Sequence, residues 1–142
     1  MISEFRDKYF FLSNFYKAPV IFDVVRYDNN EAAFQAQKCL NPEERKMFSG
    51  MNPSDAKKMG RRVKLRPDWE DVKVDLMSKI VYAKFTQNPY LATQLLDTKD
   101  EELVEGNDWG DKIWGKVNGE GQNLLGQILM ETREQIKEKV RG

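Results

Sequence analysis

The chain has 142 residues, and its 23 Lys and Arg residues balance its 23 Asp and Glu residues, so the formal net charge is zero. Hydrophobic residues make up 40% and charged residues 32%, which is enough apolar material for one compact core. Proteins that coat nucleic acid or a membrane surface usually carry a basic excess. The charge balance therefore excludes both classes, except through a local basic patch.

The set of reactive side chains is also narrow, since there is no histidine and one cysteine, Cys39. This excludes Ser-His-Asp and Cys-His mechanisms, an internal disulfide, and a zinc site built on imidazole or cysteine. No apolar run approaches the ~20 residues of a membrane helix, and Met1–Lys8 is charged, with no hydrophobic signal segment behind it. We expect a soluble cytoplasmic protein that needs no metal or other cofactor.

The first 40 residues are expected to form a small sheet followed by a helix. Tyr9–Tyr16 is rich in aromatic residues and Pro19–Tyr27 in β-branched ones, which favours two strands with a turn at Lys17–Pro19. Past residue 30 the composition changes, and Glu31–Leu40 contains the Ala, Gln and Lys residues typical of a helix.

Helices dominate the predicted remainder of the chain. Asn-Pro pairs suit an N-cap and the first helical position, and they start short helices at Asn41 and Asn52, the second of which ends near Gly60. Apolar spacings of three and four predict a long helix over 68–87, and a short one follows over 90–96.

The last 40 residues are expected to form a brief strand, an irregular loop and a final helix. The strand covers 103–105, the loop 106–121 and the helix 122–139. The buried side of that helix is predicted to consist of apolar residues, namely Leu124, Leu125, Ile128, Leu129, Ile136 and Val140. The whole chain then forms a single helix-dominated α+β domain over residues 1–142.

Three clusters could carry chemistry, and the first is Glu31, Gln35 and Lys38. On a helix these positions share one face, and small alanines lie beside them, so they suit the wall of a pocket. A solvated helix face with an acid in its first turn and a base in its last is the alternative, because both charges suit the helix dipole.

The second cluster is a basic run over residues 57–66, with six Lys and Arg residues and no acid. Arginine forks match phosphate oxygens, so the run could clamp a phosphate. A solvated basic strip is the competing interpretation.

The third cluster is a loop over residues 105–115 that contains two tryptophans and three glycines. Such loops often line ligand sites, where an indole stacks on the ligand and glycine allows close backbone approach. Trp69 is expected in the core, and one of Trp109 and Trp114 is expected there as well.

Smaller signals lie at Asn14, at residues 121–126 and at Cys39. Asn14 interrupts an aromatic segment and is either a structural tie or a ligand contact, since a buried amide needs partners. The helix start at 121–126 could receive a phosphate, and Cys39 is expected to be a buried small hydrophobe.

Taken in order, these segments resemble the YbiA-like, or NADAR, family over nearly the whole chain. Each motif is short, but seven of them occur in the family's order. They are Leu12-Ser13-Asn14-Phe15, Glu31 to Lys38, Ala56 to Arg61, Asp68-Trp69 with Met77, Lys84-Phe85 with Leu95 to Thr98, Glu105 to Gly115, and Gly121 to Arg133.

The resemblance implies an N-glycosidase that hydrolyses the bond between C1′ of a phosphorylated ribose and a nitrogen. Two substrate branches are associated with the family: ribosylated pyrimidine phosphates of early riboflavin synthesis, and ADP-ribose attached to guanine in nucleic acid. The expected partner is thus a phosphorylated ribosyl or ADP-ribosyl small molecule or an ADP-ribosylated nucleic acid, with no membrane partner. The alternative is a non-catalytic module that binds ADP-ribose or a nucleotide.

The resemblance also implies roles for individual residues. Glu31, Lys38 and Asp111 match positions expected to be catalytic. The residues expected to bind substrate are Asn14, Gln35, Arg61, Arg62, Trp109, Trp114 and Asn123. Arg61 is the preferred phosphate contact, and no residue is expected to bind a metal.

Overall fold

The computed structural model describes all residues from Met1 to Gly142 and has the helix-dominated α+β architecture that the sequence predicts. One antiparallel pair of strands is its only sheet. In chain order the elements are the 3-10 helix η1 (Asp7–Leu12), the strands β1 (Lys17–Phe22) and β2 (Val25–Asn29), and the helices α1 (Asn30–Ala36), α2 (Pro42–Lys46), α3 (Pro53–Gly60), α4 (Trp69–Gln87), α5 (Pro89–Leu96) and α6 (Leu124–Arg141).

The elements form two compact units. The inserted unit is the continuous stretch Asn14–Asn88, and it contains the hairpin and helices α1 to α4. The terminal unit joins Met1–Ser13 to Pro89–Gly142 and contains η1, α5 and α6. The expectation of one domain over residues 1–142 stays a prediction.

In the inserted unit the hairpin packs against α1 and α4. Val20 of β1 pairs with Tyr27 of β2, and both side chains are fully buried. Because successive strand residues point to opposite faces, their neighbours Ile21 and Arg26 point outward. The hairpin therefore covers the core of this unit on one side and meets solvent on the other.

Three asparagines start three of the four helices of the inserted unit. The Oδ1 atoms of Asn29, Asn41 and Asn52 accept backbone N–H bonds of 2.8 Å from the first turns of α1, α2 and α3. These contacts satisfy donors that a helix start leaves open. Capped starts at Asn41 and Asn52, with proline next, are confirmed, and α3 ends at Gly60 as predicted.

Helix α4 matches its predicted range and carries a lysine in its buried stripe. Met77, Ile80, Val81 and Phe85 are buried, and Lys84 among them is only 1% exposed. The Nζ atom of Lys84 lies 5.6 Å from the centroid of the Tyr16 ring. Burial lowers the pKa of Lys84 to about 7.

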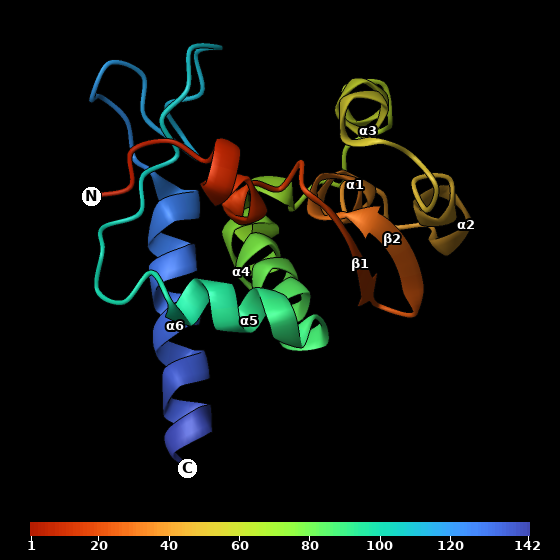
Figure 1. The fold of residues 1–142 in the computed structure, drawn as a ribbon. Coiled ribbons are helices and arrows are strands. Elements are labelled where there is room, and N and C mark those ends of the chain that lie inside the picture. Colours follow the sequence, from red (N-terminus) through yellow and green to blue (C-terminus); the bar gives the residue numbers. More distant parts are fainter. The chain divides into compact units, whose positions relative to one another are not determined.

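In the terminal unit α5 packs against α6, and the N-terminal segment pairs with the stretch before the loop (Figure 1). Ile2 and Leu103 form an isolated parallel bridge, so the predicted strand at 103–105 is reduced to a single paired residue. Buried Arg133 of α6 donates a 2.9 Å hydrogen bond to the hydroxyl of Thr98 just after α5.

The predicted strand at Tyr9–Tyr16 and the turn at Lys17–Pro19 are wrong. Residues 7–12 form η1, because Phe11 and Leu12 are both buried, whereas a strand would send these neighbours to opposite faces. The hairpin turn lies instead at Asp23 and Val24, and both have positive φ.

Two helix predictions also need correction. Helix α1 ends at Ala36, so Lys38 lies in the turn that follows, where its N–H bonds to the carbonyl of Gln35. On α6, Val140 is 73% exposed, because the buried stripe stops at Ile136, and Leu124, the first residue of the helix, is half-buried.

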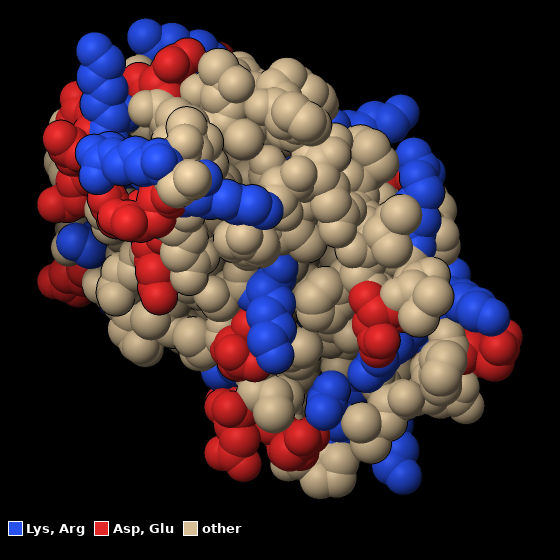
Figure 2. Space-filling view, turned by 90° about the horizontal axis from the view of Figure 1, so that it is seen from below, with Lys and Arg blue, Asp and Glu red and all other residues tan.

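No helix is both long enough and apolar enough to cross a membrane. On the face shown in Figure 2, Lys and Arg side chains intermingle with Asp and Glu, as the zero net charge leads one to expect.

Candidate functional site

The start of α1 holds Glu31 against the segment that carries Asn14. The backbone N–H of Glu31 donates to the carbonyl of Asn14 over 3.0 Å. The buried Asn14 amide donates to the sulfur of Met77 on α4 over 3.4 Å. Asn14 is therefore at least a structural tie, which fixes the backbone beside Glu31.

Gln35 lies one turn along α1 from Glu31 and is 7% exposed. Its amide nitrogen donates to Oε2 of Glu31 over 3.0 Å, so the two predicted site residues are in contact. Its Oε1 has no hydrogen-bond partner and lies against Gly60 of α3, where a β-carbon would collide with it. This close approach explains why residue 60 is glycine.

Lys38 is half-buried at the same edge of the unit. Its Nζ atom donates to the carbonyl of Gly60 over 3.3 Å and lies 5.8 Å from the ring centroid of Trp69. Burial is the largest cause that lowers the pKa of Lys38; nearby Arg61 lowers it further, and Glu31 raises it. Lys38 thus lies within electrostatic reach of both residues.

The basic run over residues 57–66 begins within α3 and contains three arginines, Arg61, Arg62 and Arg66. Arg61 and Arg62 are exposed at the end of α3, and neither forms an ion pair. Arg66 differs, because Asp68 holds it at 2.7 Å and raises its pKa by hydrogen bonding. The guanidinium groups of Arg61, which acts on Lys38, and of its chain neighbour Arg62 therefore have no acidic partner within the protein.

In the terminal unit, Asp111 organises the predicted ligand loop. Its Oδ1 accepts the N–H groups of Ile113 at 3.0 Å and Trp114 at 2.9 Å. Asn107 accepts the N–H of Asp111 over 3.0 Å and donates back to its carbonyl over 2.9 Å. These bonds tie the loop into a defined turn, which uses one carboxylate oxygen of Asp111.

Neither loop tryptophan is buried, so the expectation of one in the core is wrong. Trp109 is 54% exposed and Trp114 is half-buried. The core role expected for Trp69 is confirmed, as is the burial of Cys39.

Asn123 lies just before α6, with a left-handed backbone at φ 52°. Its amide accepts the N–H of Glu105 and donates to the carbonyl of Leu103, both over 2.9 Å. Both ends of this amide are thus engaged within the terminal unit, and its first role is to join α6 to the loop.

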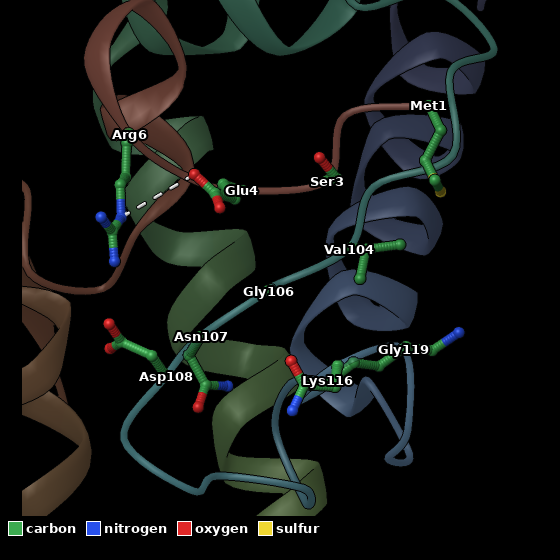
Figure 3. Close-up of a pocket in the computed structure, with 11 residues that line it drawn as sticks. Met1, Ser3, Glu4, Arg6, Val104, Gly106, Asn107, Asp108, Lys116 and Gly119 are labelled. Carbon is green, nitrogen blue, oxygen red and sulfur yellow. Dashed lines mark ion pairs between the residues drawn. The ribbon is translucent and has the colours of Figure 1, made fainter.

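A cavity of about 450 Å³ also lies in the terminal unit, between the N-terminal segment and the loop (Figure 3). Its charged lining residues are Glu4, Arg6, Asp108 and Lys116, two acids and two bases. The 4.0 Å ion pair between Glu4 and Arg6 lies on its wall. None of the predicted site residues lines this cavity.

The predicted site residues therefore form two groups, one in each unit. The inserted unit brings together Asn14, Glu31, Gln35, Lys38 and Arg61, with Arg62 next in the chain. The terminal unit holds Trp109, Asp111, Trp114 and Asn123. No group of three or more His, Cys, Asp or Glu residues could hold a metal ion.

One residue beside the site was expected only as core, and that is Trp69. Its ring faces the amine of Lys38 while the rest of the side chain is buried. A tryptophan at the start of an amphipathic helix indicates packing, and periodicity alone does not reveal a neighbouring amine. The signal that could have pointed to Trp69 as a site residue was its place in the Asp68-Trp69 motif of the family.

Comparisons with known proteins show what this chain is similar to. The NADAR domain profile matches residues 2–137. N-glycosidase YbiA of Escherichia coli (strain K12) is 41% identical over 134 residues, covering 92% of this chain and 83% of that protein. A riboflavin biosynthesis protein of Vibrio vulnificus is 37% identical over 132 residues, covering 90% of this chain and 36% of that protein.

A solved structure is similar to the whole chain. The NMR structure of E. coli YbiA superposes with a TM-score of 0.85 at 37% identity, covering all of this chain and 90% of that one.

Proposed function

Since this chain belongs to the NADAR domain family and is an N-glycosidase, we propose that it hydrolyses the bond between C1′ of a phosphorylated ribose and a nitrogen of the leaving base. The observation that carries the proposal is the contact of Gln35 with Glu31, beside Lys38. The substrates proposed are ribosylaminopyrimidine phosphates and ADP-ribosylated guanine. The names of the riboflavin biosynthesis relatives support the first class.

Glu31 is proposed to stabilise the cation that develops at C1′. Cleavage of a ribose–nitrogen bond passes through an oxocarbenium-like state, which a nearby carboxylate stabilises. The Gln35 amide holds Oε2 of this carboxylate at 3.0 Å and so fixes its orientation toward a bound sugar or an attacking water. The roles expected for Asp111 and Trp114, which lie in the terminal unit, stay predictions.

Lys38 has two proposed routes. In the covalent route, its neutral amine attacks C1′, the base leaves with a proton, and the ribose ring opens to an imine that water hydrolyses. In the other route, its ammonium donates a proton to the leaving nitrogen. Burial lowers the pKa of Lys38 and raises the share of neutral amine, and this favours the covalent route.

The arginines after α3 are proposed to bind the phosphate of the substrate. Arg61 and Arg62 are exposed and free of acidic partners, and guanidinium groups bind phosphate in a bidentate manner. Arg61 also lies near enough to affect Lys38, so a phosphate bound here stays close to the reacting carbon.

The test is to incubate the protein separately with ADP-ribosylated guanosine and with ribosylaminopyrimidine phosphates, and to measure released base. Glu31→Gln should lower kcat by at least about 10²-fold and leave substrate binding near the wild-type level. Glu43→Gln, at an exposed position of α2, is the matched control and should stay active. Binding of both substrates with no release by the wild type would instead identify a non-catalytic ADP-ribose or nucleotide-binding module.

The two Lys38 routes are separated by borohydride added during turnover. An imine would be trapped as a mass increase on Lys38, and Lys38→Arg would be nearly inactive, since guanidinium is a poor nucleophile. Retained activity in Lys38→Arg with no adduct would instead show that Lys38 supplies only positive charge near the leaving group. An adduct on another residue would contradict the covalent role.

A further inference from the structure

Trp69 packs in the core and at the same time faces the amine of Lys38. The Nζ atom of Lys38 lies 5.8 Å from the indole centroid, within the range in which a ring face attracts a cation. The same amine donates to the carbonyl of Gly60 over 3.3 Å. Trp69 is held in turn by Phe34 of α1, with the ring centroids 5.1 Å apart.

The backbone around Trp69 is tied to the turn that carries Lys38. Arg66 donates its N–H to the carbonyl of Lys38 over 3.0 Å, and its guanidinium donates to the carbonyl of Gln37 over 3.3 Å. Asp68, which precedes Trp69, binds that guanidinium at 2.7 Å. These bonds connect the start of α4 to the Lys38 turn, and they keep the indole of Trp69 in place beside the amine of Lys38.

We propose that Trp69 is a positioning residue for Lys38, and that its ring, together with the Gly60 carbonyl, holds the amine in reach of Glu31 and sets the balance between its charged and neutral forms. This inference rests on the role proposed for Lys38 in the hydrolysis.

Two opposing sets of groups act on the amine. The Trp69 ring face, the Gly60 carbonyl and the Glu31 carboxylate favour the charged form. Burial and the Arg61 guanidinium favour the neutral form, while the thiol of Cys39 adds a small effect in the opposite direction. Since burial dominates, removal of the ring's attraction should push the amine further toward its neutral form.

The test measures the pKa of Lys38 without substrate. The protein is labelled with trace formaldehyde and cyanoborohydride at a series of pH values from neutral to alkaline, and methylation of the Lys38 peptide is followed by mass spectrometry. Exposed Lys58 on α3 serves as the internal reference. Trp69→Leu keeps apolar volume but loses the ring face, whereas Trp69→Phe keeps a ring.

We expect Trp69→Leu to lower the pKa of Lys38 by roughly 0.5 to 1 unit, and Trp69→Phe to stay near the wild type. Phe48→Leu is the matched control, because Phe48 is a fully buried aromatic residue of the same unit with no role in the site. The proposal would be overturned if the pKa of Lys38 were unchanged in Trp69→Leu, or if Phe48→Leu shifted that pKa equally.

A second measurement covers the case in which Trp69→Leu does not fold. Incorporation of 5-fluorotryptophan weakens the attraction of an indole face for a cation and barely changes its shape. It should lower the pKa of Lys38 in the wild-type sequence and leave it unchanged in Trp69→Phe; equal behaviour of the two would overturn the proposal. Labelling needs no turnover, so absence of glycosidase activity would contradict the proposed function and leave this test intact.

Discussion

Arg61 lies at the end of α3 with an exposed guanidinium and no acidic partner. We expect Arg61→Gln to raise KM for a phosphorylated substrate by about tenfold or more, because a hydrogen bond to a charged group contributes about 1.5–3 kcal/mol. The change in kcat should be smaller, since the phosphate is bound in both ground and transition states.

Steady-state kinetics of Arg61→Gln and Lys64→Gln make this comparison. Lys64 is an exposed residue of the same basic run and should be replaceable at little cost. If both variants keep the wild-type KM, the run is a solvated strip.

Lys84 should make the stability of the fold depend on pH. Its folded pKa of about 7 lies below the ordinary value of 10.5, so between these values the folded state has lost a proton that the unfolded state keeps. The free energy of unfolding should therefore rise with pH above 7, by roughly 1 kcal/mol per pH unit from this group. Below pH 7 both states are protonated and the cost of burying the charge is fully present.

Urea unfolding of the wild type and of Lys84→Met at pH 6, 7, 8 and 9 checks this expectation. The variant should lose the slope, because methionine does not titrate. Lys79→Met, on the exposed side of α4, should keep it. If the free energy of unfolding of Lys84→Met rose with pH as steeply as that of the wild type, Lys84 would not be the cause of the pH dependence.

At the scale of elements, the hairpin turn between β1 and β2 is strained at Val24. This residue has φ of 70° and is 93% exposed, although a β-branched residue rarely adopts the left-handed region. Val24→Gly should raise the free energy of unfolding by about 1 kcal/mol, since glycine adopts this conformation freely. Ile21→Gly, at an exposed β1 position with extended backbone, should lower it instead, and equal effects in urea unfolding would contradict the interpretation.

The contact between α1 and α3 depends on the absence of a side chain at Gly60. A β-carbon there would meet the Gln35 amide, which is itself bonded to Glu31. Gly60→Ala should cost about 1–3 kcal/mol of stability and lower activity as well. Gly50→Ala is the control, because a β-carbon at that position would meet no atom within 4 Å, and it should be neutral in thermal unfolding.

Helices with local signals were predictable from the sequence, and the N-terminal segments were not. Asn-Pro starts and the stripe of α4 depend on neighbours within a few residues, and the structure confirms them. The aromatic segment was expected as a strand because propensity cannot tell which of Phe11 and Leu12 is buried, and both are. The burial of Lys84 was not predictable from the sequence either, because the charge of a lysine predicts an exposed side chain.

At the scale of the whole molecule, the shortage of soft ligands predicts metal-free activity. The chain has no histidine and one cysteine, which is buried. Dialysis against EDTA should leave the rate of base release unchanged, because oxocarbenium chemistry needs a carboxylate and a water rather than a Lewis acid. Loss of activity that a specific divalent metal restores would contradict this prediction.

The sequence was enough to name candidate site residues, but it did not predict the contacts that residues far apart in the chain make there. Glu31, Gln35 and Lys38 were expected together from their spacing along one helix. The approach of Gly60 and Trp69 to Lys38 joins residues 22 and 31 positions apart, and no local pattern encodes such contacts. The bridge of Ile2 to Leu103 spans 101 positions and was equally hidden.

The insertion of one unit within the other has a consequence for the order in which a nascent chain matures. Residues 14–88 are contiguous, so their native contacts are all available once Asn88 has left the ribosome. Ile2 is translated before this unit, yet its partner Leu103 is translated after it. The segment around Ile2 should therefore become ordered later than residues 14–88, and the earliest folding intermediate should contain Glu31, Gln35 and Lys38 before α6 exists.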